Sequence, residues 1–284
     1  SIVESCVLRK DPKQKEFHFN HLSSRIFGYY WNQTIFFELE QGPNSNKRPK
    51  IHQIVKDKVV QYRSNHDKQP IFFSKAEDNI SFKASQISTI LKQDVSWRFQ
   101  KVGNKEFNFY DLDFDKRTVL VHSPGLIKEY SDILFELINY RWTQKLEDLN
   151  RTSPKISQKV KGTDRENIRR KNLSQFRKYL DLENPTRRCF ITDKPILDKD
   201  LSVDHVIPWS YLYSDDLWNL VYVNKSENSS KSNRIPDEEM IEKLEKRNEK
   251  LLESIQKKFR TKHIEELKLC IKKDWVRKSW VGFR

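Results

Sequence analysis

The residues that could do chemistry together lie in one short segment of the sequence. Asp204 offers a carboxylate, His205 an imidazole, and Asn219 and Asn228 two amide groups. Cleavage of a phosphodiester needs a nucleophilic water, a group that takes its proton, and positive charge against the developing phosphorane and the leaving oxygen. One divalent metal ion and one histidine can supply all three, so these four residues are candidates for that reaction.

Each candidate has a side chain that fits a definite role. Carboxylate and amide oxygens are hard ligands, which suit Mg²⁺ or Mn²⁺ with several waters retained. We therefore expect Asp204 and Asn228 to be the metal ligands. An ordinary histidine titrates near neutrality, so we expect His205 to be the general base.

The sequence around these residues predicts two strands and a short helix. Residues 201–203 form an apolar strand that leads into Asp204, residues 220–223 form the returning strand, and residues 224–232 form a helix that presents Asn228. Because neighbouring side chains on a strand alternate between its faces, the carboxylate and the following imidazole can share a centre only where the strand ends and the chain turns.

Residues 187–236 resemble the HNH, or ββα-metal, nucleases. The intervals of 14 residues from His205 to Asn219 and 9 from Asn219 to Asn228 are similar to those of the HNH domain of RNA-guided CRISPR nucleases. The resemblance implies one divalent ion held by a hairpin and helix that cut nucleic acid. It also implies that Asp204 is the acidic metal ligand, His205 the catalytic histidine, Asn219 the residue that holds the loop and orients the histidine, and Asn228 the last metal ligand.

The segment departs from the family pattern in its cysteines. Many HNH proteins flank the hairpin with two CxxC pairs that bind a structural zinc, but here only Cys189 is present. We therefore expect no structural zinc, and expect packing to replace it through Trp209, Tyr211, Leu212, Leu217 and Trp218.

Several basic residues are candidates for contact with nucleic acid. The resemblance places Lys231 where CRISPR-type HNH domains have a lysine near the scissile phosphate. Arg234 follows it, and a basic helix is predicted after residue 163 that carries Arg169, Arg170 and Lys171. All of these could instead be ordinary solvated surface.

The overall charge is consistent with a polyanionic partner. The chain has 54 Lys and Arg against 40 Asp and Glu, a net charge of +14 and a pI near 9.5. Such a surplus attracts nucleic acid, although it also serves solubility alone. No apolar run approaches the ~20 residues that span a bilayer, and there is no secretory-type leader. With three scattered cysteines, we expect a cytoplasmic protein without contact to a membrane.

The expected fold class is α+β and mostly helical. We expect a helix-rich N-terminal domain over residues 1–150, a linker over 151–163, and an HNH nuclease domain with flanking C-terminal helices over 164–284. The apolar periodicity predicts helices near residues 20–40, 51–62, 124–146 and 237–259, and short strands near 71–73, 97–99 and 119–121. The last of the helices is expected to pack within the chain rather than form a coiled coil.

The favoured interpretation is a metal-dependent endonuclease that cuts duplex DNA in restriction or anti-phage defence. Its N-terminal domain would recognise a sequence, a modified base or a partner protein. Two alternatives stay open: a catalytically silent nucleic-acid-binding or regulatory protein on the same fold, and an HNH nuclease that cuts RNA. The sequence does not fix the oligomeric state, and one such centre cuts one strand per visit.

Overall fold

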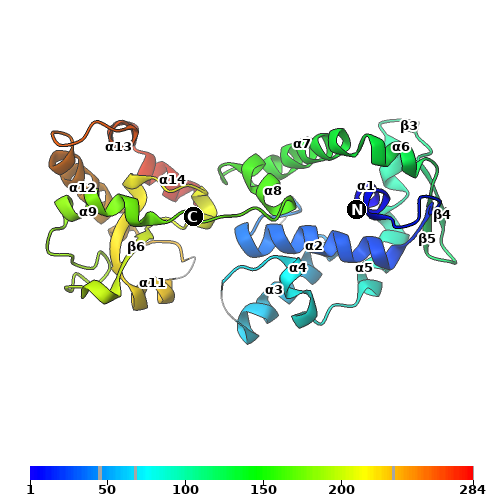
Figure 1. The fold of residues 1–284 in the computed structure, drawn as a ribbon, viewed down its shortest axis with the longest axis horizontal. Helices are drawn as coiled ribbons and strands as arrows, with labels where there is room; N and C mark the ends of the chain where they lie inside the picture. The colour runs from blue at the N-terminus through cyan, green and yellow to red at the C-terminus, as the bar shows by residue number, and fades with distance from the viewer. Residues whose placement is uncertain (44–46, 67–68, 232–233, 284) are drawn as a thin grey trace. The chain divides into compact units, whose positions relative to one another are not determined.

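The chain folds into two units, each with its own hydrophobic core. The computed structural model describes residues 1–43, 47–66, 69–231 and 234–283, without the side chains of residues 102 and 229–231. The first unit comprises Ser1–Arg151 and Ile156–Ile168, and the second comprises Thr152–Lys155 and Arg169–Arg284 (Figure 1). Helices dominate both units and the sheets are small, which confirms the α+β, mostly helical class. None of the described helices is long and apolar enough to cross a membrane.

The first unit is organised around the aromatic helix α2. Its helices are α1 (Ile2–Leu8), α2 (Phe19–Phe37), α3 (Lys50–Asn65), α4 (Phe73–Ala76), α5 (Ala84–Ile90), α6 (Pro124–Glu129), α7 (Ser131–Leu149) and α8 (Ile156–Asp164). α2 packs against α3, α5 and α8 (Figure 1). Its apolar residues on all sides predicted burial, and Phe19, Phe27 and Trp31 are fully buried.

Five short strands complete the first unit. β1 (Glu16–His18), β5 (Thr118–Val121) and β4 (Tyr110–Asp113) form an antiparallel sheet in that order, and β2 (Lys101–Val102) pairs with β3 (Lys105–Glu106). The strand predicted at 119–121 is confirmed. Those predicted at 71–73 and 97–99 are wrong, because these apolar residues pack from irregular or helical backbone: Trp31 Nε1 donates to the Ile71 carbonyl at 3.0 Å, and residues 98–100 form a 3₁₀ turn.

The apolar stripe after Pro124 forms helices but not a buried face. Only Thr143 and Leu146 of α7 are buried. The chain bends at Tyr130, between α6 and α7, so the stripe does not continue along one axis. The exposed members of the stripe, 49–60% accessible, are Leu126, Tyr130, Ile133, Leu137 and Ile138. The spacing therefore predicted the helical form correctly, but most of the apolar face is not buried.

Residues 151–163 were expected as a linker, but most of them belong to α8. Ile156 and Val160 are buried, because their spacing of four places both on the side of α8 that faces α2 and α7. The Lys159 ammonium lies 5.5 Å from the Phe37 ring centroid, a cation–π contact in the first unit. The Ser, Thr and Pro content that suggested a linker is concentrated in the four residues before the helix, which belong to the second unit.

The basic helix predicted after residue 163 is also absent at its expected start. α8 ends at Asp164, and Glu166 adopts a left-handed conformation (φ 46°). Residues 167–172 have no regular structure, and Asn172 then accepts a hydrogen bond from the Ser174 N–H at 2.8 Å to begin a 3₁₀ turn. The helix predicted over this region begins only at Arg177, as α9 (Arg177–Glu183).

The second unit surrounds a hairpin with helices. It contains α9, β6 (Leu201–His205), α10 (Trp209–Leu212), β7 (Leu220–Asn224), α11 (Lys225–Lys231), α12 (Glu238–Ile255), α13 (Lys262–Lys273) and α14 (Trp275–Phe283). Asp237 caps α12 by accepting from the Met240 N–H at 2.8 Å. α12 packs against α9, α13 and α14, which confirms packing within the chain (Figure 1). The apolar residues expected in place of zinc belong to this core: Trp209, Leu212, Leu217 and Trp218 are buried, and Tyr211 is partly buried.

The buried and exposed sides of α7 are expected to contribute differently to the free energy of unfolding. Leu146→Ala is expected to lower the free energy of unfolding by about 2–5 kcal/mol, because Leu146 is fully buried and alanine leaves a cavity. Leu137→Ala on the same helix is expected to change it by less than about 1 kcal/mol, because Leu137 is 56% exposed. Denaturant unfolding of both variants checks this, and equal losses would show that the stripe is buried after all.

Candidate active site

The candidate site is carried by an antiparallel hairpin and the helix that follows it. β6 pairs with β7 so that Asp204 lies opposite Val221 and His205 opposite Leu220. The four apolar residues of β7 are all buried, because the strand crosses the core of the second unit. α11 begins directly after β7 and packs against both strands, which brings Asn228 back over the hairpin (Figure 1).

Asn219 closes the loop that follows β6. Its side chain is fully buried, its Oδ1 accepts from the Ile207 N–H at 2.8 Å, and its Nδ2 donates to the Ile207 carbonyl at 2.8 Å. The backbone carbonyl of Asn219 also accepts from the Val206 N–H at 2.9 Å. β6 ends at His205, and the chain turns there into Pro208 and α10, as the sequence predicted.

Asp204 and Asn228 lie side by side on one face of the hairpin. One end of the Asn228 amide is 3.1 Å from Asp204 Oδ1 and 3.3 Å from Oδ2. With the amide oxygen at that end, acceptors face each other and Nδ2 donates to Ser202 Oγ at 3.3 Å. With the amide rotated, Nδ2 donates to both carboxylate oxygens instead. In either orientation the two side chains stay in contact.

The oxygens of Asp204 and Asn228 fit one hard divalent cation. Mg²⁺ binds oxygen at about 2.0–2.1 Å in octahedral geometry, which separates adjacent ligand oxygens by about 3 Å. The 3.1 Å between the amide end and the carboxylate has this spacing. Over the described part of the chain, no group of three His, Cys, Asp or Glu side chains could hold a metal. Mg²⁺ commonly uses one or two protein ligands and keeps its remaining positions for water and phosphate.

His205 contacts a carboxylate that the sequence alone did not indicate. Its Nε2 lies 3.1 Å from Asp215 Oδ1, and the two side chains are only 9% and 14% exposed. β6 ends at His205, so the chain leaves the strand directly after the imidazole and the alternation of side chains ends there. Consecutive Cα atoms are only about 3.8 Å apart. The structure therefore brings Asp204 to Asn228 and His205 to Asp215, as two pairs that start from adjacent points of the chain.

Two buried polar residues of α12 hold the backbone on either side of Asn219. Asn248 Nδ2 donates to the Trp218 carbonyl at 3.0 Å, and Arg247 donates to the Leu220 carbonyl. Arg247 is 8% exposed, and burial lowers the pKa of its guanidinium to about 10. These bonds attach the strand that carries the site to the central helix of the second unit.

Of the basic residues expected to contact nucleic acid, Arg170 has a defined contact close to the candidate site. The Arg170 guanidinium lies 5.0 Å from the ring centroid of Trp209, the first residue of α10 after the loop held by Asn219. All the candidates whose side chains are described are exposed, namely Arg169, Arg170, Lys171 and Arg234. The side chain of Lys231, at the end of α11, lies outside the described residues. Arg170 is thus brought beside the loop that carries the site.

Three residues that support the site were missed or misread in the sequence. Asp215 follows His205 by ten residues, and a carboxylate in the loop that returns to Asn219 was a usable signal. Asn248 lies among the apolar residues of α12, and an amide at a buried position indicates a backbone contact, because it must find hydrogen-bond partners. Arg247 gave no signal, because α12 carries many charged residues that are exposed.

Comparison with known proteins identifies the same part of the chain. Residues 189–237 match a family model described as HNH endonuclease. The matched range contains β6, β7 and α11, and with them Asp204, His205, Asn219 and Asn228. No curated protein and no solved structure gave a significant match.

The two asparagines are expected to respond differently to substitution. Asn219→Ala leaves the N–H and carbonyl of Ile207 buried without partners, each at a cost of about 1–3 kcal/mol, so we expect a large loss of stability. Asn228→Ala is expected to cost less than about 1 kcal/mol, because that amide is partly exposed and its hydrogen bonds are long. Urea unfolding without metal measures both, and similar losses would contradict the loop-closing role of Asn219.

Proposed function

We propose that this nuclease, whose HNH endonuclease domain makes it a phosphodiester hydrolase, cuts DNA with the help of Mg²⁺ or Mn²⁺. The observation that carries the proposal is the contact of the Asp204 carboxylate with the Asn228 amide at the end of β6. Both residues then hold the ion, which when bound supplies positive charge to the phosphate and its leaving oxygen.

We assign to His205 the role of general base, which accepts the proton of the attacking water. The contact of its Nε2 with Asp215 fixes the ring and favours a proton on that nitrogen, which leaves Nδ1 as the acceptor. Asp215 is a positioning residue, since it acts through the imidazole. Asn219 is a second one, because it holds the loop that the imidazole precedes.

Duplex DNA is the proposed substrate, and restriction or anti-phage defence the proposed role. The net charge of +14 and the position of Arg170 beside α10 support a polyanion at this site. A ββα hairpin contacts mainly the nucleic-acid backbone, so target choice needs another surface, and the first unit can supply one through DNA or a partner protein. Three buried free thiols are consistent with action in a reducing cytoplasm.

The proposal predicts metal-dependent cleavage, and it predicts different defects for substitution of the general base and of a metal ligand. Wild-type protein with plasmid and Mg²⁺ or Mn²⁺ is expected to yield nicked or linear DNA. His205→Ala is expected to slow single-turnover cleavage by about 10²–10⁴-fold and to keep Mn²⁺ binding in calorimetry, because the base is lost but not the ligands. Asp204→Ala is expected to lose both activity and Mn²⁺ binding.

A matched control is available on the surface of the first unit. His122 Nε2 lies 2.9 Å from Asp111 Oδ2, so His122→Ala removes an exposed His–Asp pair that belongs to the other unit. It is expected to cleave as wild type does. Absence of cleavage by folded wild type with all common divalent ions would reject the proposal, and cleavage of RNA but not of DNA would reject its substrate.

Asp215→Asn tests the positioning role. The change keeps the size of the side chain but removes its charge, so the imidazole is held less firmly. We expect the rate of single-turnover cleavage to fall by roughly 10- to 100-fold, which is part of the rate enhancement that a general base contributes. The affinity for DNA and for Mn²⁺ is expected to stay unchanged. Asp216→Asn, at the neighbouring carboxylate that accepts from Ser214 Oγ, is the control. An unchanged rate in Asp215→Asn would exclude the role.

A further inference from the structure

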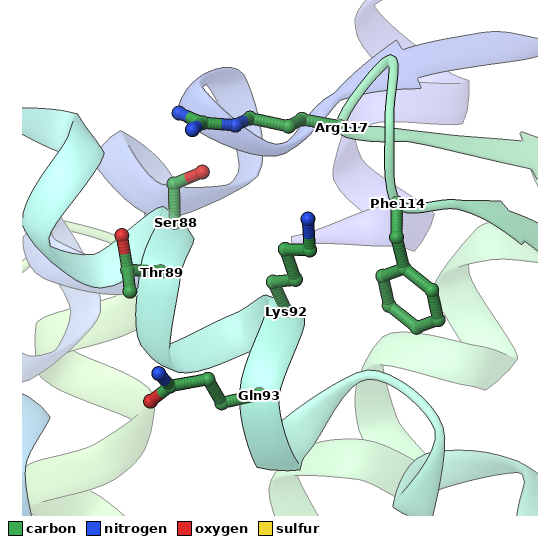
Figure 2. Close-up of a pocket in the computed structure, with 6 residues that line it drawn as sticks. All are labelled: Ser88, Thr89, Lys92, Gln93, Phe114 and Arg117. Carbon is green, nitrogen blue, oxygen red and sulfur yellow. The ribbon is translucent and has the colours of Figure 1, made fainter.

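The first unit contains a cavity that the nuclease chemistry does not use. It has a volume of about 460 Å³ and lies where α5 and the π-helical turn Leu91–Val95 meet the turn between β4 and β5 (Figure 2). This volume is within the range of about 300–1,000 Å³ typical of small-ligand sites. The residues that line it are Ser88, Thr89, Lys92, Gln93, Phe114 and Arg117.

The lining carries two cations and no carboxylate. Lys92 comes from the π-helical turn and Arg117 from the turn between the strands, and within the described residues neither has an ion-pair partner. The acidic residues nearby on these elements are engaged with other cations: Asp94 pairs with Arg98 at 2.7 Å, and Asp113 pairs with Lys116 at 3.6 Å. Asp115 stands on the same turn but does not line the cavity. An anion in the cavity would therefore meet two available positive charges.

A buried hydroxyl group opens into the same space. Ser88 is 1% exposed, and its Oγ makes no hydrogen bond to any described residue. Figure 2 shows this oxygen on the side of the cavity that Arg117 overhangs. Thr89 Oγ1 donates to the Ser85 carbonyl at 2.9 Å and can still accept. Two hydroxyl groups on the α5 side of the cavity can therefore hydrogen-bond to a bound group.

The remaining lining suits an aromatic base. The Phe114 ring is 36% exposed and lines the cavity. An exposed aromatic ring can stack on a nucleic-acid base. Cations for a phosphate and a ring for a base therefore occur in one cavity.

We propose that this cavity binds one nucleotide, with its phosphate between Lys92, Arg117 and the Ser88 hydroxyl, and its base against Phe114. The nucleotide is a unit of the DNA substrate whose base has left its pair, in which case the inference rests on the proposed function, or a free nucleotide with the same chemistry. The first unit then contributes its own recognition of the substrate or of a nucleotide signal.

The test measures binding in EDTA, so that cleavage does not interfere. The probes are a fluorescein-labelled single-stranded 20-nucleotide DNA followed by anisotropy at several salt concentrations, and the four nucleoside monophosphates followed by calorimetry. The double variant Lys92→Gln/Arg117→Gln is compared with Lys128→Gln/Arg141→Gln, which changes the charge equally at exposed positions of α6 and α7 in the same unit. Thermal unfolding of each variant shows that it is folded.

Lys92→Gln/Arg117→Gln is expected to bind the probe that occupies the cavity at least tenfold more weakly than wild type does. The control variant is expected to bind it as wild type does. For the strand, the slope of log affinity against log salt is expected to fall by about 0.7 for each phosphate that the variant no longer neutralises. Phe114→Ala, which keeps both cations, is expected to weaken binding roughly five- to hundredfold, because the base can no longer stack on the ring. Binding of the DNA identifies a strand unit, and binding of a monophosphate alone identifies a free nucleotide.

Equal binding by wild type and both cavity variants would overturn the inference, as would the absence of binding to every probe. Neither result depends on metal or on cleavage. A protein that binds a probe through the cavity but cuts no nucleic acid would refute the proposed function and leave this inference standing. A protein that cuts DNA but binds no probe through the cavity would refute this inference and leave the proposed function standing.

Discussion

Two hydrogen bonds from one buried side chain to the backbone of Ile207 hold the nuclease site in place. The Asn219 amide carries a donor and an acceptor, so it pairs with the N–H and carbonyl of one residue as a neighbouring strand would. These bonds fix the loop that begins where β6 ends, and so set where Asp204 and His205 leave the strand. Asn248 and Arg247 of α12 hold the backbone on either side of Asn219, because they donate hydrogen bonds to the carbonyls of Trp218 and Leu220. Water cannot replace these contacts, since the groups are buried.

The local part of the site could be predicted from sequence because its signals are local. Apolar residues before Asp204 and before Asn224 predicted the two strands, and both are present, with the apolar residues of β7 buried in the core. The connection between them is long and contains α10, so the approach of Asn228 to Asp204 was predicted from the spacing of the motif and not from a tight turn. Asp215 was not found because its partner is fixed by the path of an irregular loop, and periodicity says nothing about such a path.

Burial was harder to predict than helical form. Residues 126–140 have apolar side chains at helical spacing, but the bend at Tyr130 and the position of α8 leave most of them exposed. In α8 the opposite occurred, because two apolar residues four apart are enough to bury a helix that is otherwise polar. The packing partner decides such cases, and it comes from elsewhere in the chain. The cavity beside Lys92 has the same origin, since its lining joins segments that are distant in the sequence.

The contact between the Asn228 amide and the Asp204 carboxylate bears on how the fold is held together at the hairpin. Without a cation, the amide nitrogen can donate to the Asp204 carboxylate, so an empty centre remains folded and internally hydrogen-bonded. Domains built around structural zinc behave differently, because removal of their ion unfolds them. The second unit instead has a hydrophobic core around the hairpin, so its fold does not depend on an ion at the proposed site.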